Sequence, residues 1–434
     1  MDPGPVKIFT SSDVPRLRYI TGILLQDIMG LSYEVVTDRR KLGKSPVINY
    51  STSEIKGSFR INPDSLLFEN DIRKRELRVT EWRGLPVFFQ SNENSDLPFD
   101  IFAASFYLIS RYEEYLEFTP DKYGRFSAQS SFSFINGFLG KPVIDLWTTE
   151  WTRLLVVKLQ NLVFKKNRFR SIVTFDIDQP FEYLGKNVLR SLGGLIRDIG
   201  KKERRVAERY RTVSGGEKDP WDVFDYIFGM IDSSGSDAKF FVPVGDRSEY
   251  DRNPSWTNED YRRLVRNVAD KYQTGLHPSF KASLNPAKLI TERERLKSIL
   301  TKEITISRFH FLNVKFPDSY NNLIEAGVKE DYSMGYHDEP GFRAGISRPF
   351  NFYDLSKEKE TDLRIFPFQV MDATLFRYKK MKPADAGEML TKIIETTKNA
   401  GGLFMSIWHN TSLLDNEEWK GWREVFETML TTRQ

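Results

Sequence analysis

The sequence contains no cysteine, which excludes disulfide bonds, thiol nucleophiles and thiolate metal ligands. It also lacks any run near the roughly 20 apolar residues that span a bilayer, so we expect no transmembrane segment. Neither sign of charge dominates, because 64 Lys and Arg stand against 60 Asp and Glu. A net charge of +4 gives little support for nucleic acid as a partner, since phosphate binding usually needs a concentrated basic surface.

The first residues, "MDPGPVKIFT", lack the basic start and apolar run of a secretory signal, so we expect a soluble, cytoplasmic protein. Apolar residues make up 40% of the chain and aromatic residues 14%, which is enough for globular cores. A length of 434 residues is too great for one ordinary core. The sequence therefore predicts two domains.

Residues 1–165 consist of short apolar segments separated by Gly, Pro, Asn and Asp. This pattern predicts strands in "SPVINYST", "GSFRINP", "SLLFEN" and "LPVFFQS". Helical spacing predicts a helix in "PRLRYITGILLQDIMG", ending at Gly30, and another in "PFDIFAASFYLISRYEEYLEF". We interpret this half as a smaller α+β domain of unknown role.

Residues 166–434 alternate apolar strands with amphipathic helices. Strands are predicted in "FRSIVTFDID", "AKFFVPVG", "TGLHP", "ITISRFHF" and "LFMSIWHN", with helical patterns between them. This alternation is typical of parallel β/α units, so the fold class is α/β. Such sheets and barrels carry their chemistry at the carboxyl ends of the strands.

Acidic and imidazole side chains gather at those predicted strand ends. Asp176 and Asp178 end one strand and share a face, because they are two positions apart. The chain has only four histidines, and three of them, His277, His310 and His409, follow other predicted strands. A single strand-end Asp is more often a turn or cap residue, but the joint placement predicts one shared site. The fourth histidine lies in the loop "MGYHDEP", and we expect a structural role for it.

The chemistry that this set of side chains supports is metal-assisted hydrolysis. Imidazole and carboxylate together suit a divalent ion, Zn²⁺ above all, with one position open for water. The ion would lower the pKa of that water and polarise the carbonyl group under attack. A second carboxylate could accept the proton of the water, and a separate histidine could protonate the leaving group.

These motifs resemble those of the polysaccharide deacetylases, the nodulation-protein-like carbohydrate esterases. "TFDID" is similar to the first motif of that family, which implies that Asp176 is the general base and Asp178 a metal ligand, with Ile177 inserted between them. "GLHPSFKAS" resembles the second motif and implies that His277 is a metal ligand. The resemblance implies an irregular (β/α) barrel over residues 166–434 that removes N- or O-acetyl groups from an acetylated carbohydrate.

Two later segments extend the resemblance. "ISRFHF" stands in place of the motif whose arginine orients the catalytic aspartate, which implies that role for Arg308. "LFMSIWHN" resembles the motif whose histidine protonates the leaving group, which implicates His409 as a catalytic residue. The whole chain also resembles an uncharacterised bacterial group in which a small N-terminal domain precedes a deacetylase-like barrel. The oligomeric state, the glycan and the position of the acetyl group are left open.

The main departure from the family pattern is Lys281, which stands where the family has a second metal-binding histidine. Lysine cannot be a ligand while it is charged, so we predict that His310 is the third ligand. Alternatively, the Lys281 ammonium group fills the cation site itself. The protein would then be a non-catalytic glycan-binding or assembly protein on a degenerate deacetylase barrel.

Two further groups of polar residues lie outside these motifs. In "FDIFAASFYLISRYEEYL", Arg111 and Glu114 are three positions apart, which favours an ion pair on a helix surface over a second site. In "GFRAGISRPF", Arg343 and Arg348 occupy a Gly-containing loop. They could hold an anionic substrate or stabilise the fold, and the sequence does not separate these alternatives.

Overall fold

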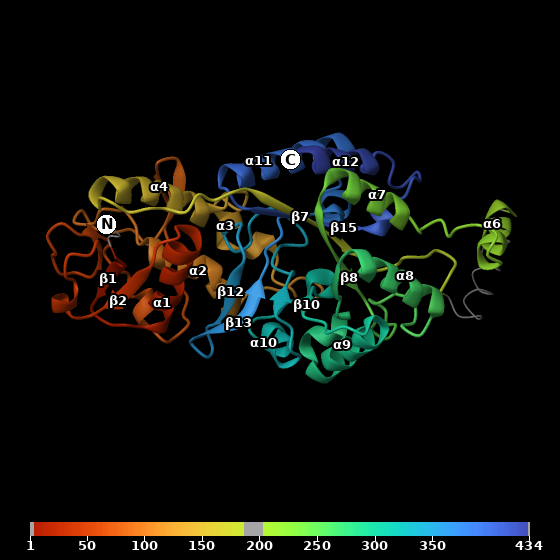
Figure 1. The fold of residues 1–434 in the computed structure, drawn as a ribbon, viewed down its shortest axis with the longest axis horizontal. Coiled ribbons are helices and arrows are strands. Elements are labelled where there is room, and N and C mark those ends of the chain that lie inside the picture. The colour runs from red at the N-terminus through yellow and green to blue at the C-terminus, as the bar shows by residue number, and fades with distance from the viewer. Residues whose placement is uncertain (1–3, 186–202, 433–434) are drawn as a thin grey trace.

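The computed structural model describes residues 4–185 and 203–432. It contains a four-stranded sheet in the N-terminal part of the chain and a nine-stranded sheet in the remainder. Figure 1 shows the two parts side by side, with the N-terminal part in red and orange. Within the described ranges, no helix combines the length and apolar character that crossing a bilayer requires.

The N-terminal sheet has the strand order β2-β1-β3-β4, and all its strands are parallel. Its strands are β1 (Val6–Thr10), β2 (Tyr33–Val36), β3 (Val47–Tyr50) and β4 (Phe59–Arg60). A separate hairpin pairs β5 (Thr80–Trp82) with β6 (Leu85–Val87). The segment "SLLFEN" is not the predicted strand, because Asp64 caps a 3₁₀ turn over Ser65–Phe68. Because the strands of this sheet are parallel, this half is closer to an α/β arrangement than to the predicted α+β arrangement.

The first two helices of this half begin within the segments where the apolar spacing predicts them. The first, α1 (Pro15–Thr21), continues as a π-helix over Gly22–Ile28, and the chain turns at Gly30, where φ is +74°. The second, α2 (Ile101–Ile109), is shorter than predicted because Arg111 adopts a left-handed conformation with φ of +54°. Two more helices follow, α3 (Phe132–Ile135) and α4 (Val143–Lys158).

The nine-stranded sheet has the order β12-β13-β11-β10-β9-β8-β7-β15-β14, and only β12 and β13 pair antiparallel. Its strands are β7 (Arg170–Asp176), β8 (Asp237–Val242), β9 (Gln273–Leu276), β10 (Ile306–Ser307), β11 (Glu330–Asp331), β12 (Phe350–Asp354), β13 (Lys359–Ile365), β14 (Val370–Met371) and β15 (Leu403–His409). The predicted domain boundary at 165/166 falls in the connection between α4 and β7, where no helix or strand is assigned.

Helices follow most of these strands, as the alternating sequence pattern predicts. They are α6 (Glu203–Val213), α7 (Phe224–Ser234), α8 (Glu259–Lys271), α9 (Pro286–Leu300), α10 (Asp318–Glu325), α11 (Pro383–Asn399) and α12 (Trp422–Thr432). Figure 1 shows α7, α11 and α12 along one side of the sheet and α9 and α10 toward the opposite side, while α6 projects away from the remainder. The described part of the chain is therefore a mixed α/β structure built around a mainly parallel sheet.

The large sheet buries apolar side chains on both faces. Phe175 of β7 stacks on Phe240 of β8 and contacts Phe426 of α12, so this face packs against helices. The opposite face holds a smaller cluster to which Phe241 of β8 and Met405 of β15 belong. Residues that follow β11 and precede β14 join the same cluster, so the sheet curves and its two ends approach each other.

One short segment bridges the two ends of the curved sheet. The Phe368 amide donates to the Met334 carbonyl over 3.0 Å, just beyond β11. The next residue, Gln369, donates its amide to the Met405 carbonyl of β15 over 3.0 Å. The hydrogen-bonded strand order itself remains open, with β12 and β14 at its ends.

Buried ion pairs connect the N-terminal part to the segment between β11 and β12 of the C-terminal part. Arg111 donates to Glu113 and to Glu114 over 2.8 Å each, and to the Tyr336 hydroxyl over 2.9 Å. Arg343 donates from Nε to Glu114 over 2.9 Å and from Nη1 to the Gly335 carbonyl over 2.9 Å. The prediction of a helix-surface pair was wrong about location, because Arg111 and Glu114 are buried between the two halves.

The two arginines of the "GFRAGISRPF" loop are therefore structural. Arg348 pairs with the buried Asp145 of α4, whose other oxygen accepts the Ser347 amide over 2.8 Å. Arg343 is buried and belongs to the cluster around Glu114. Of the two alternatives that the sequence left open, the anion-binding role is excluded for both side chains, since their guanidinium groups already have internal partners.

Candidate active site

The carboxyl ends of four strands, within a run of five consecutive strands of the large sheet, bring the predicted site residues together. Asp176 is the last residue of β7 and lies opposite His409, the last residue of β15. His277 directly follows β9, and Arg308 and His310 follow β10. Because β15, β7, β8, β9 and β10 are consecutive and parallel, these side chains meet at one edge of the sheet.

The inserted Ile177 does not separate the two acids. Its amide donates to the Phe241 carbonyl over 3.0 Å, which continues the β7 ladder by one residue. The Ile177 side chain is fully buried in the apolar core. The alternation of a strand therefore turns Asp176 and Asp178 to the same face, toward the histidines.

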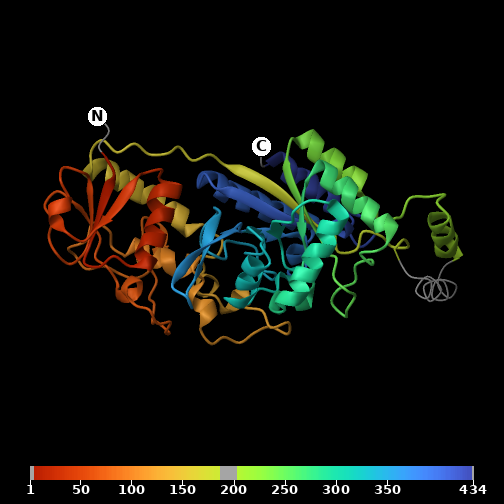
Figure 2. The same cartoon turned by 60° about the horizontal axis from the view of Figure 1, so that its bottom comes forward.

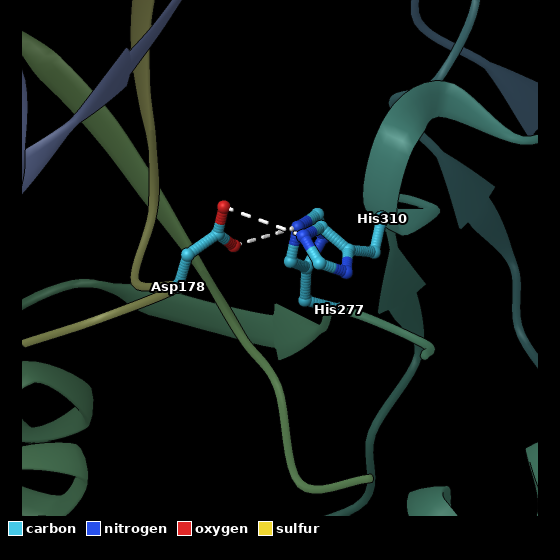
Figure 3. Close-up of side chains that lie close together, drawn as sticks. All are labelled: Asp178, His277 and His310. Carbon is cyan, nitrogen blue, oxygen red and sulfur yellow. Dashed lines mark ion pairs between the residues drawn. The ribbon is translucent and has the colours of Figure 1, made fainter. Parts of the chain in front are cut away.

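Three of these side chains form a compact group that could hold a metal ion, the candidate ligand set, which Figure 3 shows. The Asp178 carboxylate lies 3.2 Å from His277 Nε2 through Oδ1 and 3.4 Å from His310 Nε2 through Oδ2. One ligand atom from each residue can be chosen so that all lie within 4.8 Å of one another. Metal bonds of about 2.0–2.1 Å in a tetrahedron place neighbouring ligand atoms about 3.3 Å apart, so the spacing fits a small divalent ion.

Hydrogen bonds orient both imidazole rings toward the centre of this set. His277 Nδ1 lies 2.6 Å from the Arg308 carbonyl, and His310 Nδ1 lies 2.9 Å from Asp251 Oδ1. A proton on each Nδ1 satisfies these acceptors and leaves the Nε2 lone pairs facing Asp178. Metal-binding histidines in proteins are held in this way by a carbonyl or a carboxylate.

Two buried atoms at the centre have no hydrogen-bond partner among the described residues. They are His277 Nε2 and Asp178 Oδ1, which face each other. Leaving a buried polar atom unpaired costs about 1–3 kcal/mol, so such atoms in a folded protein call for a ligand. A divalent cation between a lone pair and a carboxylate satisfies both atoms at once.

The charges around this set reinforce one another. Burial raises the pKa of Asp178, but His310 and His277 outweigh it, and the pKa lies well below its usual value. Burial lowers the pKa of His310, yet the Asp178 and Asp251 carboxylates together raise it to about 10. The local field therefore favours positive charge at this position, whether the cation is a proton or a metal ion.

Asp176 is held beside the ligand set by a buried arginine. Arg308 Nη1 donates to Asp176 Oδ1 over 2.8 Å, and Nη2 donates to the Thr174 hydroxyl over 2.7 Å. Arg308 Nε donates to the Tyr332 carbonyl over 2.9 Å, so the guanidinium group is fixed in the core. The other oxygen of Asp176 lies 3.8 Å from His277 Nε2 and remains available on the side of the site.

His409 stands on the other side of Asp178 and has its own carboxylate partner. Asp372 accepts the His409 amide over 2.7 Å and lies 2.8 Å from His409 Nδ1. Burial lowers the pKa of His409, but Asp372 outweighs this effect and the pKa rises to about 9. Nε2 lies 3.6 Å from Asp178 Oδ2. A protonated His409 can thus donate from Nε2 into the site.

Lys281 does not occupy the cation site. It lies in a 3₁₀ segment over Phe280–Leu284, is exposed to solvent, and makes no ion pair with any residue that the structure describes. The proposal that its ammonium group replaces a metal ion is therefore wrong. The turn after His277 carries the fourth following position away from the site, because Pro278 and Ser279 lead the chain into that segment.

Several residues of the site escaped the sequence analysis. Asp251 and Asp372 orient His310 and His409, and Arg125 comes from the N-terminal half. Of these residues, only Asp372 has a feature from which it could have been found, because it directly follows the short strand β14 at the same edge of the sheet. His337, which we expected to be structural, lines a cavity of about 150 Å³ together with Asp176, Asp178, His277, His310 and His409.

The comparisons with known proteins give one family profile and a set of similar solved structures. A family profile described as a family of unknown function, DUF7033, matches residues 6–160. No curated protein matches the chain. Among solved structures, the chain is similar to a protein from Mycobacterium smegmatis that is assigned as a polysaccharide deacetylase. The TM-score is 0.39 and the identity 13%, over 62% of this chain and 84% of that chain.

Two further solved structures show the same level of similarity. The polysaccharide deacetylase Bc1974 from Bacillus cereus has a TM-score of 0.30 and 12% identity, over 62% of this chain and 87% of that chain. The CE4 family pseudoenzyme BA3943 from Bacillus anthracis has a TM-score of 0.30 and 9% identity, over 62% of each chain. Because these TM-scores are low, the functional argument rests on the side chains of the site.

Proposed function

We propose that this protein is a metal-dependent hydrolase that removes N- or O-acetyl groups from a sugar, a polysaccharide or a glycolipid precursor. The observation that carries the proposal is the pair of unpartnered buried atoms, His277 Nε2 and Asp178 Oδ1, beside His310 Nε2. One carboxylate and two imidazoles with an open side are a ligand set of catalytic zinc sites. The acetylated carbohydrate as substrate rests on the motif resemblance.

Asp178, His277 and His310 would hold the divalent ion, and Zn²⁺ suits this mixture of nitrogen and oxygen ligands best. When bound, the ion would lower the pKa of a water molecule and polarise the acetyl carbonyl group. No other described residue is needed to complete the set, since the fourth position belongs to water or substrate.

Asp176 would accept the proton of the attacking water. Arg308 engages Oδ1 and thereby keeps Oδ2 directed at the site, where it lies 3.8 Å from His277 Nε2. His409 would donate a proton from Nε2 to the departing amine or alcohol, because Asp372 retains the Nδ1 proton and stabilises the imidazolium. A bond forms between the water oxygen and the carbonyl carbon, the C–N or C–O bond breaks, and acetate is released.

The non-catalytic alternative has lost the feature that favoured it, since Lys281 is exposed and lies outside the ligand set. The strand-end position of every proposed catalytic residue fits the (β/α) barrel type of site that the resemblance implies. We therefore retain the hydrolase as the single proposed function.

The experiment combines metal analysis with acetate release. The purified protein should contain a divalent metal, lose acetate release from acetylated sugars with a chelator, and regain it with Zn²⁺. Asp176→Asn should keep the metal and slow acetate release by about 10²–10⁴-fold. Asp270→Asn, on the exposed surface of α8, is the matched control. Metal at background level together with chelator-insensitive turnover, or full activity of Asp176→Asn, would refute the proposed function.

A further inference from the structure

A large cavity opens outward from the ligand set. Its volume is about 680 Å³, and Asp178 and His310 line its inner end. A space of this size accommodates a ligand of more than one sugar ring, since pockets for drug-sized molecules span about 300–1,000 Å³. Substrate can therefore reach the proposed metal site along the walls of this cavity.

The N-terminal half supplies one of these walls. Lys122 and Tyr123 line the cavity and belong to a turn between Asp121 and Arg125. Asp121 accepts the amides of Tyr123 and Arg125 over 2.9 Å each, and Gly124 completes the turn with φ of +83°. Figure 2 shows orange chain of the N-terminal half extending along the lower edge of the C-terminal half.

This turn is anchored to the segment that carries His310. Arg125 is buried, binds Asp121 over 2.7 Å and donates from Nη1 to the Phe311 carbonyl over 2.6 Å. The rings of Tyr123 and Phe311 also meet edge to face, with centroids 5.2 Å apart. The wall from the N-terminal half is therefore fixed relative to the ligand set.

Aromatic rings make up much of the cavity wall. They are Tyr123, Tyr250, Phe311 and Tyr378. Rings of this kind present a flat apolar face and, in tyrosine, a hydroxyl group that forms hydrogen bonds. A sugar ring offers matching apolar C–H faces and polar edges, so the wall is suited to a carbohydrate.

Three cations complete the lining, namely Lys122, Arg252 and Arg377. Their side chains are exposed, and none makes an ion pair or side-chain hydrogen bond within residues 4–185 and 203–432. Lys122 lies over the Tyr123 ring, with Nζ 4.9 Å from its centroid. The acids of the lining are Asp178, which belongs to the ligand set, and Glu249, which lies beside the Tyr250 hydroxyl. The outer cavity is thus net positive, with guanidinium groups free to bind an external anion.

We propose that this cavity recognises an anionic acetylated sugar, whose carboxylate or phosphate group binds Lys122, Arg252 and Arg377 while its rings pack on the aromatic wall. The position of the acetyl group in this inference rests on the proposed function. The anion site, by contrast, is inferred from the residues of the cavity wall alone. Guanidinium groups bind carboxylate and phosphate through paired hydrogen bonds, which a neutral hydroxyl group cannot replace.

The test measures binding separately from hydrolysis. Zinc-loaded protein is titrated calorimetrically with trigalacturonic acid, with a hexose phosphate and with neutral tri-N-acetylchitotriose. We expect at least one anionic probe to bind about 10-fold or more tightly than the neutral probe, and to weaken as salt is raised. The uronate and phosphate arms identify which anion the cavity prefers. Equal affinity for all three probes would overturn the proposal.

Arginine variants test where in the cavity the anion binds. Arg377→Gln combined with Arg252→Gln should reduce the ratio of anionic to neutral affinity by about 10-fold, while the zinc content stays unchanged. Arg263→Gln removes one positive charge from the exposed surface of α8 and is the control for the loss of an arginine remote from the cavity. An unchanged ratio in the double variant would overturn the proposal. Anion binding without acetate release from any acetylated sugar would refute the proposed hydrolase and leave the anion site intact.

Discussion

Ionisable side chains cluster at two places, namely between the two halves of the chain and at the carboxyl ends of the strands. The two clusters differ in whether their charges are paired within the protein. Between the halves, Arg111 and Arg343 are buried with Glu113 and Glu114, and every guanidinium group has carboxylate and carbonyl partners. Arg343 and Arg111 lower the pKa of Glu114 despite burial, which otherwise raises it.

At the strand ends, by contrast, the charges do not balance internally. His277 Nε2 and Asp178 Oδ1 have no hydrogen-bond partner among the described residues, and a cavity reaches them. A fully paired buried cluster offers nothing to a ligand, while unpaired atoms around an accessible space retain their capacity to bind one. The comparison thus separates charges that hold the fold together from charges that can act on another molecule.

The largest expected effect is that of Asp178→Asn. The amide removes the one anionic ligand, so zinc binding and acetate release should fall to background. The metal-free variant should also unfold at a lower urea concentration than the metal-free parent, because the lowered pKa of Asp178 means that His310 and His277 stabilise its ionised carboxylate in the folded protein. Metal analysis and urea unfolding measure both effects. Retention of stoichiometric zinc would show that the ligand set is assigned wrongly.

Glu114→Gln should lower stability without lowering zinc affinity. The substitution leaves Arg111 and Arg343 buried without their shared carboxylate, and removing one partner from such a pair costs about 3–5 kcal/mol of unfolding free energy. Zinc affinity of the folded variant should equal that of the parent. Glu150→Gln, which removes a carboxylate of exposed pairs on α4, is the control. A loss of less than about 1 kcal/mol would mean that the interface cluster contributes little to stability.

Asp372→Asn addresses the orientation of His409 without touching the ligand set. Loss of the carboxylate weakens the hold on Nδ1 and the stabilisation of the imidazolium, and such partners typically contribute about 10- to 100-fold to activity. The deficit should be large for N-acetyl substrates and small for an activated aryl acetate, whose leaving group needs no proton. Kinetics on both substrates provide the measurement. An equal loss on both substrates would argue against His409 as the proton donor.

The positions of the site residues could be predicted from the sequence to the extent that local pattern determines them. Apolar runs that end in Asp176, His277 and His409 identify strand ends, and parallel strands bring their carboxyl ends to one edge. The mixed α/β class followed from the same alternation of strands and helices. The catalytic and metal-binding roles remain predictions.

What could not be predicted depends on contacts between distant segments. Asp251 reaches His310 from a loop, and Arg111, which has left the helical conformation, donates to Tyr336 in the other half of the chain. Lys281 stood at a family ligand position, yet the turn after His277 carries it to the surface. No local spacing encodes these outcomes, since each is decided by tertiary packing.

The smallest expected effect tests whether the N-terminal half tunes the site. Arg125 holds the carbonyl of Phe311, whose φ of +60° is a conformation that non-glycine residues rarely adopt, directly after His310. Arg125→Lys keeps the charge but cannot bind Asp121 through paired hydrogen bonds and reach Phe311 as well. Zinc affinity, measured by competition with a chromophoric chelator, should fall about 3- to 10-fold, in line with one lost hydrogen bond. Arg153→Lys, at an exposed pair on α4, should leave zinc affinity unchanged. Equal zinc affinity in both variants would mean that the N-terminal turn forms a cavity wall without positioning His310.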